Sequence, residues 1–208
     1  SRTTAVFAAA DTPVVLEDPG FIESQIVIPP LAGNPEVTQL RVGLNISHTF
    51  LSDLLVTLIG PDPDGPNGPA QPITLILVNQ EGADQDNIVN LRIADDGDFF
   101  TITNPFNNFN GVYAPSQLFD PTDPRGLASF AGTPISGTWT LRVEDVFETD
   151  SGTLNSWTLN FLDADGNPLV IDRAANGMDQ DADANQLEAA NDVYSAPRST
   201  AGTPLTGP

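Results

Sequence analysis

Two segments with alternating apolar and polar residues, at 137–145 and 152–161, constrain the fold of this chain more than any other feature. Their apolar positions fall on one face each: Trp139, Leu141 and Val143 in the first segment, and Trp157, Leu159 and Phe161 in the second. A period of two predicts half-buried β-strands. These segments hold both Trp residues of the chain, and Trp has the largest apolar surface to bury. We therefore expect the main core to form around them.

Shorter strand-like segments recur about every ten residues along the rest of the chain. They lie at residues 5–7, 12–16, 22–30, 40–47, 54–59, 73–77 and 169–171, whereas residues 79–98 are polar apart from Ile88, Val89, Leu91 and Ile93. Turn residues separate them, in a chain with 17 Gly and 19 Pro. The segment at 54–59 is almost continuously apolar, which predicts a central strand covered on both faces. This pattern favours an all-β sandwich or barrel.

The charge is strongly negative, with 28 Asp and Glu residues against seven Arg and no Lys, giving −21. This charge argues against nucleic acids and anionic membranes as partners, because both require clustered basic residues. It is compatible with divalent cations. Cysteine is absent, which excludes disulfides, thiolate metal sites and thiol nucleophiles. No apolar run approaches the length of a membrane span, so we expect no membrane insertion.

Two motifs resemble the P domain, also called the Homo B domain, of proprotein convertases and their bacterial relatives. The first is Ser-His-Thr-Phe-Leu-Ser-Asp-Leu-Leu-Val-Thr-Leu-Ile-Gly-Pro at 47–61. The second is Gly-Thr-Trp-Thr-Leu-Arg-Val-Glu-Asp at 137–145, followed by Gly-Thr-Leu-Asn-Ser-Trp-Thr-Leu-Asn-Phe at 152–161. The resemblance implies a jelly-roll-like antiparallel β-sandwich. We expect a lead-in at 1–20, the sandwich at 21–162 and an acidic, Pro- and Thr-rich extension at 163–208.

The resemblance also implies a function. In this family the P domain follows a subtilisin-like catalytic domain and supports its folding, or it is a module of a secreted bacterial protein, and some members bind Ca²⁺. We expect a secreted, Ca²⁺-stabilised, non-catalytic module. Its partners would be a protease catalytic domain or other domains of the same polypeptide. Two alternatives remain open. One is the accessory part of a subtilisin-like endopeptidase whose catalytic domain is absent from this chain, and the other is a carbohydrate-binding jelly roll.

The residues themselves argue against catalysis by this chain. A serine protease needs a nucleophile, a base and an orienting acid. The only His is His48, for which we expect a structural hydrogen bond, and the nucleophile stretch of a subtilisin is missing. The string Asp-Ser-Gly-Thr at 150–153 matches an aspartic protease, but that chemistry needs a second Asp and no second string exists.

Calcium is the most plausible ligand, because it prefers six to eight oxygen ligands. The candidate ligands in the sandwich are Asp53, Asp95, Asp96, Asp145 and Asp150. Asp95 and Asp96 are expected to lie at a turn. If the loops meet at one end of the sandwich, then Asp53, Asp96 and Asp145 would share an ion. In the competing interpretation, Asp53 and Asp145 cap backbone amides at strand ends.

The C-terminal extension offers a second candidate calcium loop. Asp179, Asp181 and Asp183 occupy positions 1, 3 and 5 of a calcium-loop spacing. Ala184 and Ala190 stand where an EF-hand requires Gly and Glu, so the loop is not an EF-hand. The alternative is an acidic linker with no bound ion.

Overall fold

The computed structural model describes residues 2–64, 68, 70–82, 85–99 and 109–172. The strands are β1 (Arg2–Thr4), β2 (Val6–Ala8), β3 (Val14–Val15), β4 (Gly20–Ile28), β5 (Gln39–His48), β6 (Leu54–Ile59), β7 (Thr74–Asn79), β8 (Ile88–Asp98), β9 (Phe109–Tyr113), β10 (Gly137–Asp145), β11 (Gly152–Leu162) and β12 (Val170–Asp172). Three short 3-10 helices join them: η1 (Leu51–Asp53), η2 (Ser116–Phe119) and η3 (Leu127–Phe130). No helix in these segments is long and apolar enough to cross a membrane.

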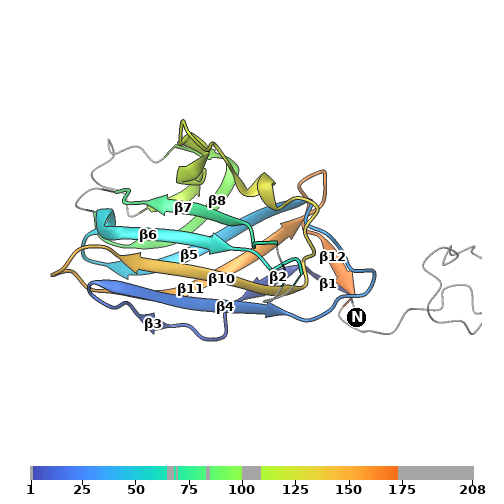
Figure 1. Ribbon diagram of the computed structural model, residues 1–208, viewed down its shortest axis with the longest axis horizontal. Helices are drawn as coiled ribbons and strands as arrows, with labels where there is room; N and C mark the ends of the chain where they lie inside the picture. Colours follow the sequence, from blue (N-terminus) through green and yellow to red (C-terminus); the bar gives the residue numbers. More distant parts are fainter. Residues whose placement is uncertain (1, 65–67, 69, 83–84, 100–108, 173–208) are drawn as a thin grey trace, which may run out of the picture.

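Ten of the twelve strands form two facing sheets, which confirms the predicted all-β sandwich, and β1 and β12 pair in a separate two-stranded sheet. One sheet has the order β4-β10-β6-β7, and Figure 1 shows these strands side by side. The other has the order β2-β11-β5-β8-β9, with β3 also paired to β11. Strands β8 and β9 pair in parallel, whereas the other strand pairs in the described residues are antiparallel. Strand β6 lies between β10 and β7 and is mostly buried, as its apolar sequence predicts.

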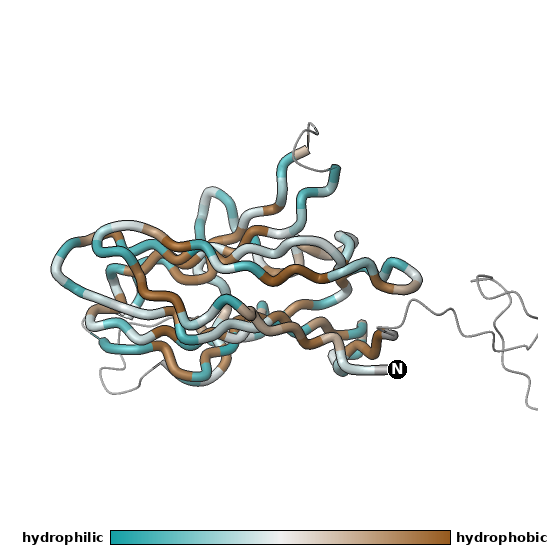
Figure 2. The backbone as a smooth tube through the Cα atoms, turned by 90° about the horizontal axis from the view of Figure 1, so that it is seen from below, coloured by the Kyte–Doolittle hydropathy of each residue, from teal (hydrophilic) through white to brown (hydrophobic). Residues whose placement is uncertain are grey.

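The two Trp-bearing strands are consecutive in the chain but belong to opposite sheets. Their rings meet in the core, as predicted: Trp139 of β10 packs edge-on against Phe161 of β11, with ring centroids 5.6 Å apart. The ring of Phe130, in η3, also packs against Trp139, with ring centroids 5.3 Å apart. The backbone coloured by hydropathy alternates between brown and teal along the strands (Figure 2), as expected when one face of each sheet is buried.

Both indole N–H groups have hydrogen-bond partners, which a buried Trp requires. Trp139 Nε1 donates to the Ile135 carbonyl at 3.0 Å. Trp157 Nε1 donates to Ser24 Oγ at 2.7 Å, and Ser24 Oγ donates to Asp11 Oδ1 at 2.6 Å. This chain of bonds connects the N-terminal segment to the core, alongside the pairing of β2 and β3 with β11. The two short strands predicted at 5–7 and 12–16 are therefore present, while the domain boundaries stay a prediction.

The predicted turn at Asp95 and Asp96 is wrong, because β8 runs through both residues to Asp98. The reason is close contact with β9: a side chain at Gly97 would collide with the backbone of Tyr113 and Ala114. The glycine therefore allows β9 to approach β8, and the Ala114 N–H donates to the Asp98 carbonyl at 2.9 Å. A Gly next to three Asp residues suggests a turn in the sequence but serves strand packing here.

The core predicts a large loss of stability for Trp157→Ala. Trp157 is 1% exposed, so we expect the free energy of unfolding to fall by roughly 3–5 kcal/mol in chemical denaturation. Phe147→Ala is the matched aromatic control, because Phe147 is 56% exposed and its removal should change stability by about 0.5 kcal/mol or less. Similar losses for the two variants would contradict the placement of Trp157 in the core.

Candidate metal centre

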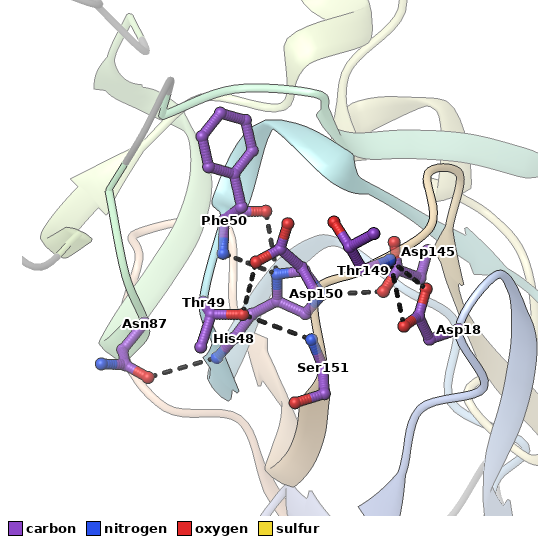
Figure 3. Close-up of polar contacts among 9 residues, drawn as sticks. All are labelled: Asp18, His48, Thr49, Phe50, Asn87, Asp145, Thr149, Asp150 and Ser151. Carbon is purple, nitrogen blue, oxygen red and sulfur yellow. Dashed lines mark hydrogen bonds and ion pairs between the residues drawn. The ribbon is translucent and has the colours of Figure 1, made fainter.

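Four strand ends meet at one end of the sandwich. Strand β5 ends at His48, β6 starts directly after η1, β10 ends at Asp145, and β11 starts at Gly152. In the register of the sheets, His48 lies opposite Gly152 and Asp145 lies opposite Leu54. Because β10 and β11 are in different sheets, the loop between them spans both layers at this end. Figure 3 shows the side chains that gather there.

His48 and Asp145 form a buried pair at the centre of this group. His48 Nε2 donates to Asp145 Oδ2 at 2.9 Å, and both side chains are 0% exposed. The other ring nitrogen, Nδ1, lies 2.8 Å from the Phe50 carbonyl and 3.1 Å from the Phe50 N–H. A protonated Nδ1 donates to that carbonyl, and an unprotonated Nδ1 accepts from that N–H. The ring therefore has partners in both states, and the predicted structural role of His48 is confirmed.

Gly152 allows the strands to close around His48. A side chain at this position would collide with the His48 ring and with the Ser47 carbonyl. The space that the His48 ring of the first motif occupies therefore requires a glycine at Gly152 of the second motif. This contact explains why the two motifs, about 100 residues apart, belong to one structural unit.

Three more carboxylates, those of Asp18, Asp53 and Asp150, lie at the same end of the sandwich as the buried pair. Asp150 Oδ1 accepts a hydrogen bond from Thr49 Oγ1 at 2.8 Å, and Asp18 accepts one from the Thr149 N–H at 3.2 Å (Figure 3). Thr149 has a φ of 93°, an unfavourable conformation for a β-branched residue, and the bond to Asp18 helps to hold it.

Asp53 is 5% exposed, and burial raises the pKa of its carboxyl group. The negative charges of Asp145 and Asp150 raise this pKa further, and the charge of Asp18 adds to them. The imidazole of His48 acts in the opposite direction and lowers it. The centre thus concentrates more negative charge than its one histidine can balance.

Asp145 Oδ1 is the one buried side-chain oxygen or nitrogen without a hydrogen-bond partner in the described part of the chain. Such an atom is costly, because an unpaired charged oxygen loses its hydration on burial. A cation next to Asp53 and Asp145 would satisfy this oxygen and reduce the repulsion. Among the described residues, no three His, Asp or Glu side chains are grouped closely enough to hold a metal by themselves. An ion here would therefore also need backbone carbonyls or water, both of which Ca²⁺ accepts.

The other predicted ligands lie elsewhere. Asp95 accepts hydrogen bonds from the Leu127 and Ala128 N–H groups at 2.6 and 2.8 Å, so the capping role proposed for Asp53 and Asp145 belongs to Asp95 instead. Asp96 pairs with Arg41 at 3.5 Å, and Arg41 lies seven residues before His48 in β5. A shared site of Asp53, Asp96 and Asp145 is therefore wrong, because Asp96 lies towards the opposite end of β5. Asp179, Asp181 and Asp183 lie outside the described residues.

Asp18 and Thr49 are members of this centre that the sequence interpretation missed. Thr49 follows His48 directly in the first motif, so its position there was a usable signal. Asp18 carried no such signal, since it lies in the lead-in and reaches the centre only through its bond to the loop between β10 and β11.

Asp53→Asn is expected to raise the melting temperature at about pH 7 when Ca²⁺ is chelated, because the amide carries no charge into the centre. The raised pKa means that the folded protein binds the Asp53 proton more tightly than the unfolded chain. The protonated Asp53 therefore adds to the free energy of unfolding below the ordinary carboxyl pKa of 3.8. This contribution is lost as the pH rises through the pKa of Asp53 in the folded protein. The advantage of the variant should therefore shrink on acidification. Thermal denaturation across this pH range measures the effect, and Asp96→Asn is the control. Equal changes in melting temperature for the two variants would contradict the placement of Asp53 among buried acidic neighbours.

Known proteins support the resemblance indicated by the sequence motifs. Residues 97–161 match the family model described as the proprotein convertase P-domain. The calcium-dependent protease of Nostoc sp. is 26% identical over 129 residues, which cover 62% of this chain and 14% of that protein. The transglutaminase-activating metalloprotease of Streptomyces mobaraensis is 26% identical over 150 residues, which cover 72% of this chain and 14% of that protein.

The leupeptin-inactivating enzyme 1 of Streptomyces exfoliatus is 28% identical over 152 residues, which cover 73% of this chain and 25% of that protein. The chain thus spans a quarter or less of the length of these relatives. The family match includes the second sequence motif, at 137–161, whereas the first motif lies outside it. The resemblance to the proprotein convertase P domain is confirmed, and it rests on the family match over residues 97–161.

Proposed function

We propose that this chain is a non-catalytic accessory module of a secreted protease, and that Ca²⁺ bound beside Asp53 and Asp145 stabilises it. The P-domain match carries the first part of the proposal. The relatives include a calcium-dependent protease and a metalloprotease, so the shared segment occurs in proteases of different kinds. A segment shared by different proteases, covering 14–25% of each, is best explained by a supporting role outside the chemical step.

The state of His48 supports the absence of catalysis. A general base must reach the proton that it removes. Both ring nitrogens of His48 are occupied, by Asp145 and by the backbone of Phe50, and its side chain is 0% exposed. His48 is the only His in the chain, so a triad built on histidine has no other candidate base.

The charge balance of the metal centre supports the calcium part of the proposal. Asp145 Oδ1 is unpaired, and the pKa of Asp53 is raised by burial and by its acidic neighbours. A bound Ca²⁺ would supply the missing positive charge. The ordinary alternative is that the centre tolerates this repulsion as a structural His-Asp pair, and metal titration separates the two cases.

Added Ca²⁺ should raise the melting temperature of the purified chain, and EDTA should reverse the rise. At a free Ca²⁺ concentration about 100 times the dissociation constant, the stabilisation would be about 2.7 kcal/mol. Asp145→Asn and Asp53→Asn should abolish the calcium-dependent part, whereas Asp96→Asn, with the same change in charge at the Arg41 pair, should keep it.

A combined Asp179→Asn, Asp181→Asn, Asp183→Asn variant tests the second candidate loop. If that loop binds an ion, calorimetry will count fewer sites in the variant while the melting shift remains. An unchanged melt of the wild-type chain with Ca²⁺ would contradict a stabilising site in the sandwich.

The purified chain is expected to hydrolyse neither labelled casein nor short fluorogenic peptides, with or without Ca²⁺. The physical reason is that the one histidine is enclosed by Asp145 and Phe50. Activity that persists through repeated purification and disappears in His48→Gln, with the fold intact by circular dichroism, would overturn the proposed non-catalytic role.

A further inference from the structure

The outer face of the six-stranded sheet carries a polar hollow of about 460 Å³, away from the acidic metal centre. It lies over three neighbouring strands, β11, β5 and β8. In the register of these strands, Thr158, Gly43 and Arg92 form one row across the sheet. Asn45 faces Ser156 in the next row, and Asn90 lies beside it on β8.

Gly43 forms the floor of this hollow. A Cβ at this position would lie 2.5 Å from Thr158 Oγ1, so a larger residue would both collide with Thr158 and fill the space. A glycine in the middle of a central strand lowers β-propensity, and it often marks a place where another group approaches closely.

Two irregularities in the sheet surround Asn45. The register of β11 shifts between Leu154 and Ser156, and the pairing of β5 with β8 shifts between Leu44 and Ile46. Bulges of this kind redirect side chains and occur often next to functional sites. Here they allow the Asn90 N–H to donate to Asn45 Oδ1 at 2.7 Å, while Asn45 Nδ2 donates to Ser156 Oγ at 3.0 Å. The amide and hydroxyl groups that face the hollow are thus fixed in orientation.

Arg92 supplies a positive charge that has no acidic partner among the residues that the structure describes. Of the four Arg residues whose side chains the structure describes, Arg41, Arg125 and Arg142 each lie within 4 Å of a carboxylate. Arg92 has no ion pair within the described residues, and the lining of the hollow contains no Asp or Glu. In a chain with 28 acidic residues, this local absence of carboxylates leaves the guanidinium free for an external anion.

We propose that this hollow binds the carboxylate-bearing sugar unit of an acidic saccharide. Arg92 would bind the sugar carboxylate, and the amide and hydroxyl groups of Asn45, Ser156 and Thr158 would bind its ring hydroxyls. The net charge of −21 does not prevent such binding, because charges more than about 8 Å apart are largely screened at physiological salt. The proposal does not depend on the calcium site or on the protease-associated role.

A saccharide fits this hollow better than an acidic peptide. An extended peptide binds a sheet mainly through free backbone groups at an edge strand. Strands β11 and β5 have neighbours on both sides, as does β8, so their backbone groups are used within the sheet. The hollow offers side-chain amides, hydroxyls and one guanidinium, which match a ring that carries hydroxyls and a carboxylate.

Binding can be measured by NMR titration of the folded chain with a trimer of galacturonic acid, at one fixed Ca²⁺ concentration. Shifts should be confined to amides of β5, β8 and β11 around Gly43. Arg92→Gln should weaken binding by about 10- to 100-fold, as expected for the loss of one charge-assisted contact. Gly43→Thr should abolish binding by filling the floor. Arg125→Gln removes the same charge at the Asp123 pair, outside the hollow, and should leave the affinity unchanged.

Three other results would overturn the proposal. The first is the absence of shifts at the hollow, and the second is equal weakening by Arg92→Gln and Arg125→Gln, which would indicate unspecific charge attraction. The third is equal or tighter binding of a neutral sugar trimer or of tri-glutamate, which would remove the need for a sugar carboxylate. Since Gly43→Thr can disturb folding, the comparison of the two Arg variants is decisive, and unchanged melting temperatures serve as the check on their folds.

Discussion

The contact between Trp139 and Phe161 across the core is the interaction on which the rest of the structure depends. The two rings come from β10 and β11, which lie in different sheets, so their contact joins the two layers of the sandwich. The short connection between them then has to cross from one layer to the other. It does so at the end of the sandwich where β5 ends and β6 begins. The acidic loop therefore lies where the chain passes between the two layers of the sandwich.

The buried pair of His48 and Asp145 is the second constraint, and it carries an electrostatic cost. Replacing such a pair by apolar side chains is often neutral or stabilising, so its presence is weak evidence for a stabilising role by itself. Here the pair leaves Asp145 Oδ1 unpaired and stands next to the buried Asp53. The Ca²⁺ proposed above would offset this electrostatic cost, because it would pair with the unpaired oxygen and reduce the repulsion between the carboxylates.

The two polar regions of the molecule have opposite chemistry. At the His48 end, Asp145 contacts the imidazole, and Asp53 lies within electrostatic reach of Asp145, Asp150 and Asp18, an excess of negative charge that suits a cation. On the outer face of the six-stranded sheet, the Arg92 guanidinium, which has no ion pair within the described residues, lies among amides and hydroxyls, which suits an anion with hydroxyl groups. The first region belongs to strand ends and loops, and the second belongs to the middle of the strands. The two proposed sites are therefore separate in space, so a substitution in one leaves the residues of the other in place.

The sequence by itself determined the class of fold, because a period of two with turn residues between segments permits few alternatives to a β-sandwich. It also identified both Trp residues as core and His48 as structural. Its motifs singled out Asp53 and Asp145, but spacing cannot tell which loops meet, since that depends on which sheet each strand joins. Only the tertiary structure showed that Asp18 lies at this centre and that Asp96 does not. The tertiary structure also showed that Gly97 packs against β9 and does not form a turn. The contact between neighbouring strands, and not the local turn preference of Gly and Asp, determines the backbone conformation there.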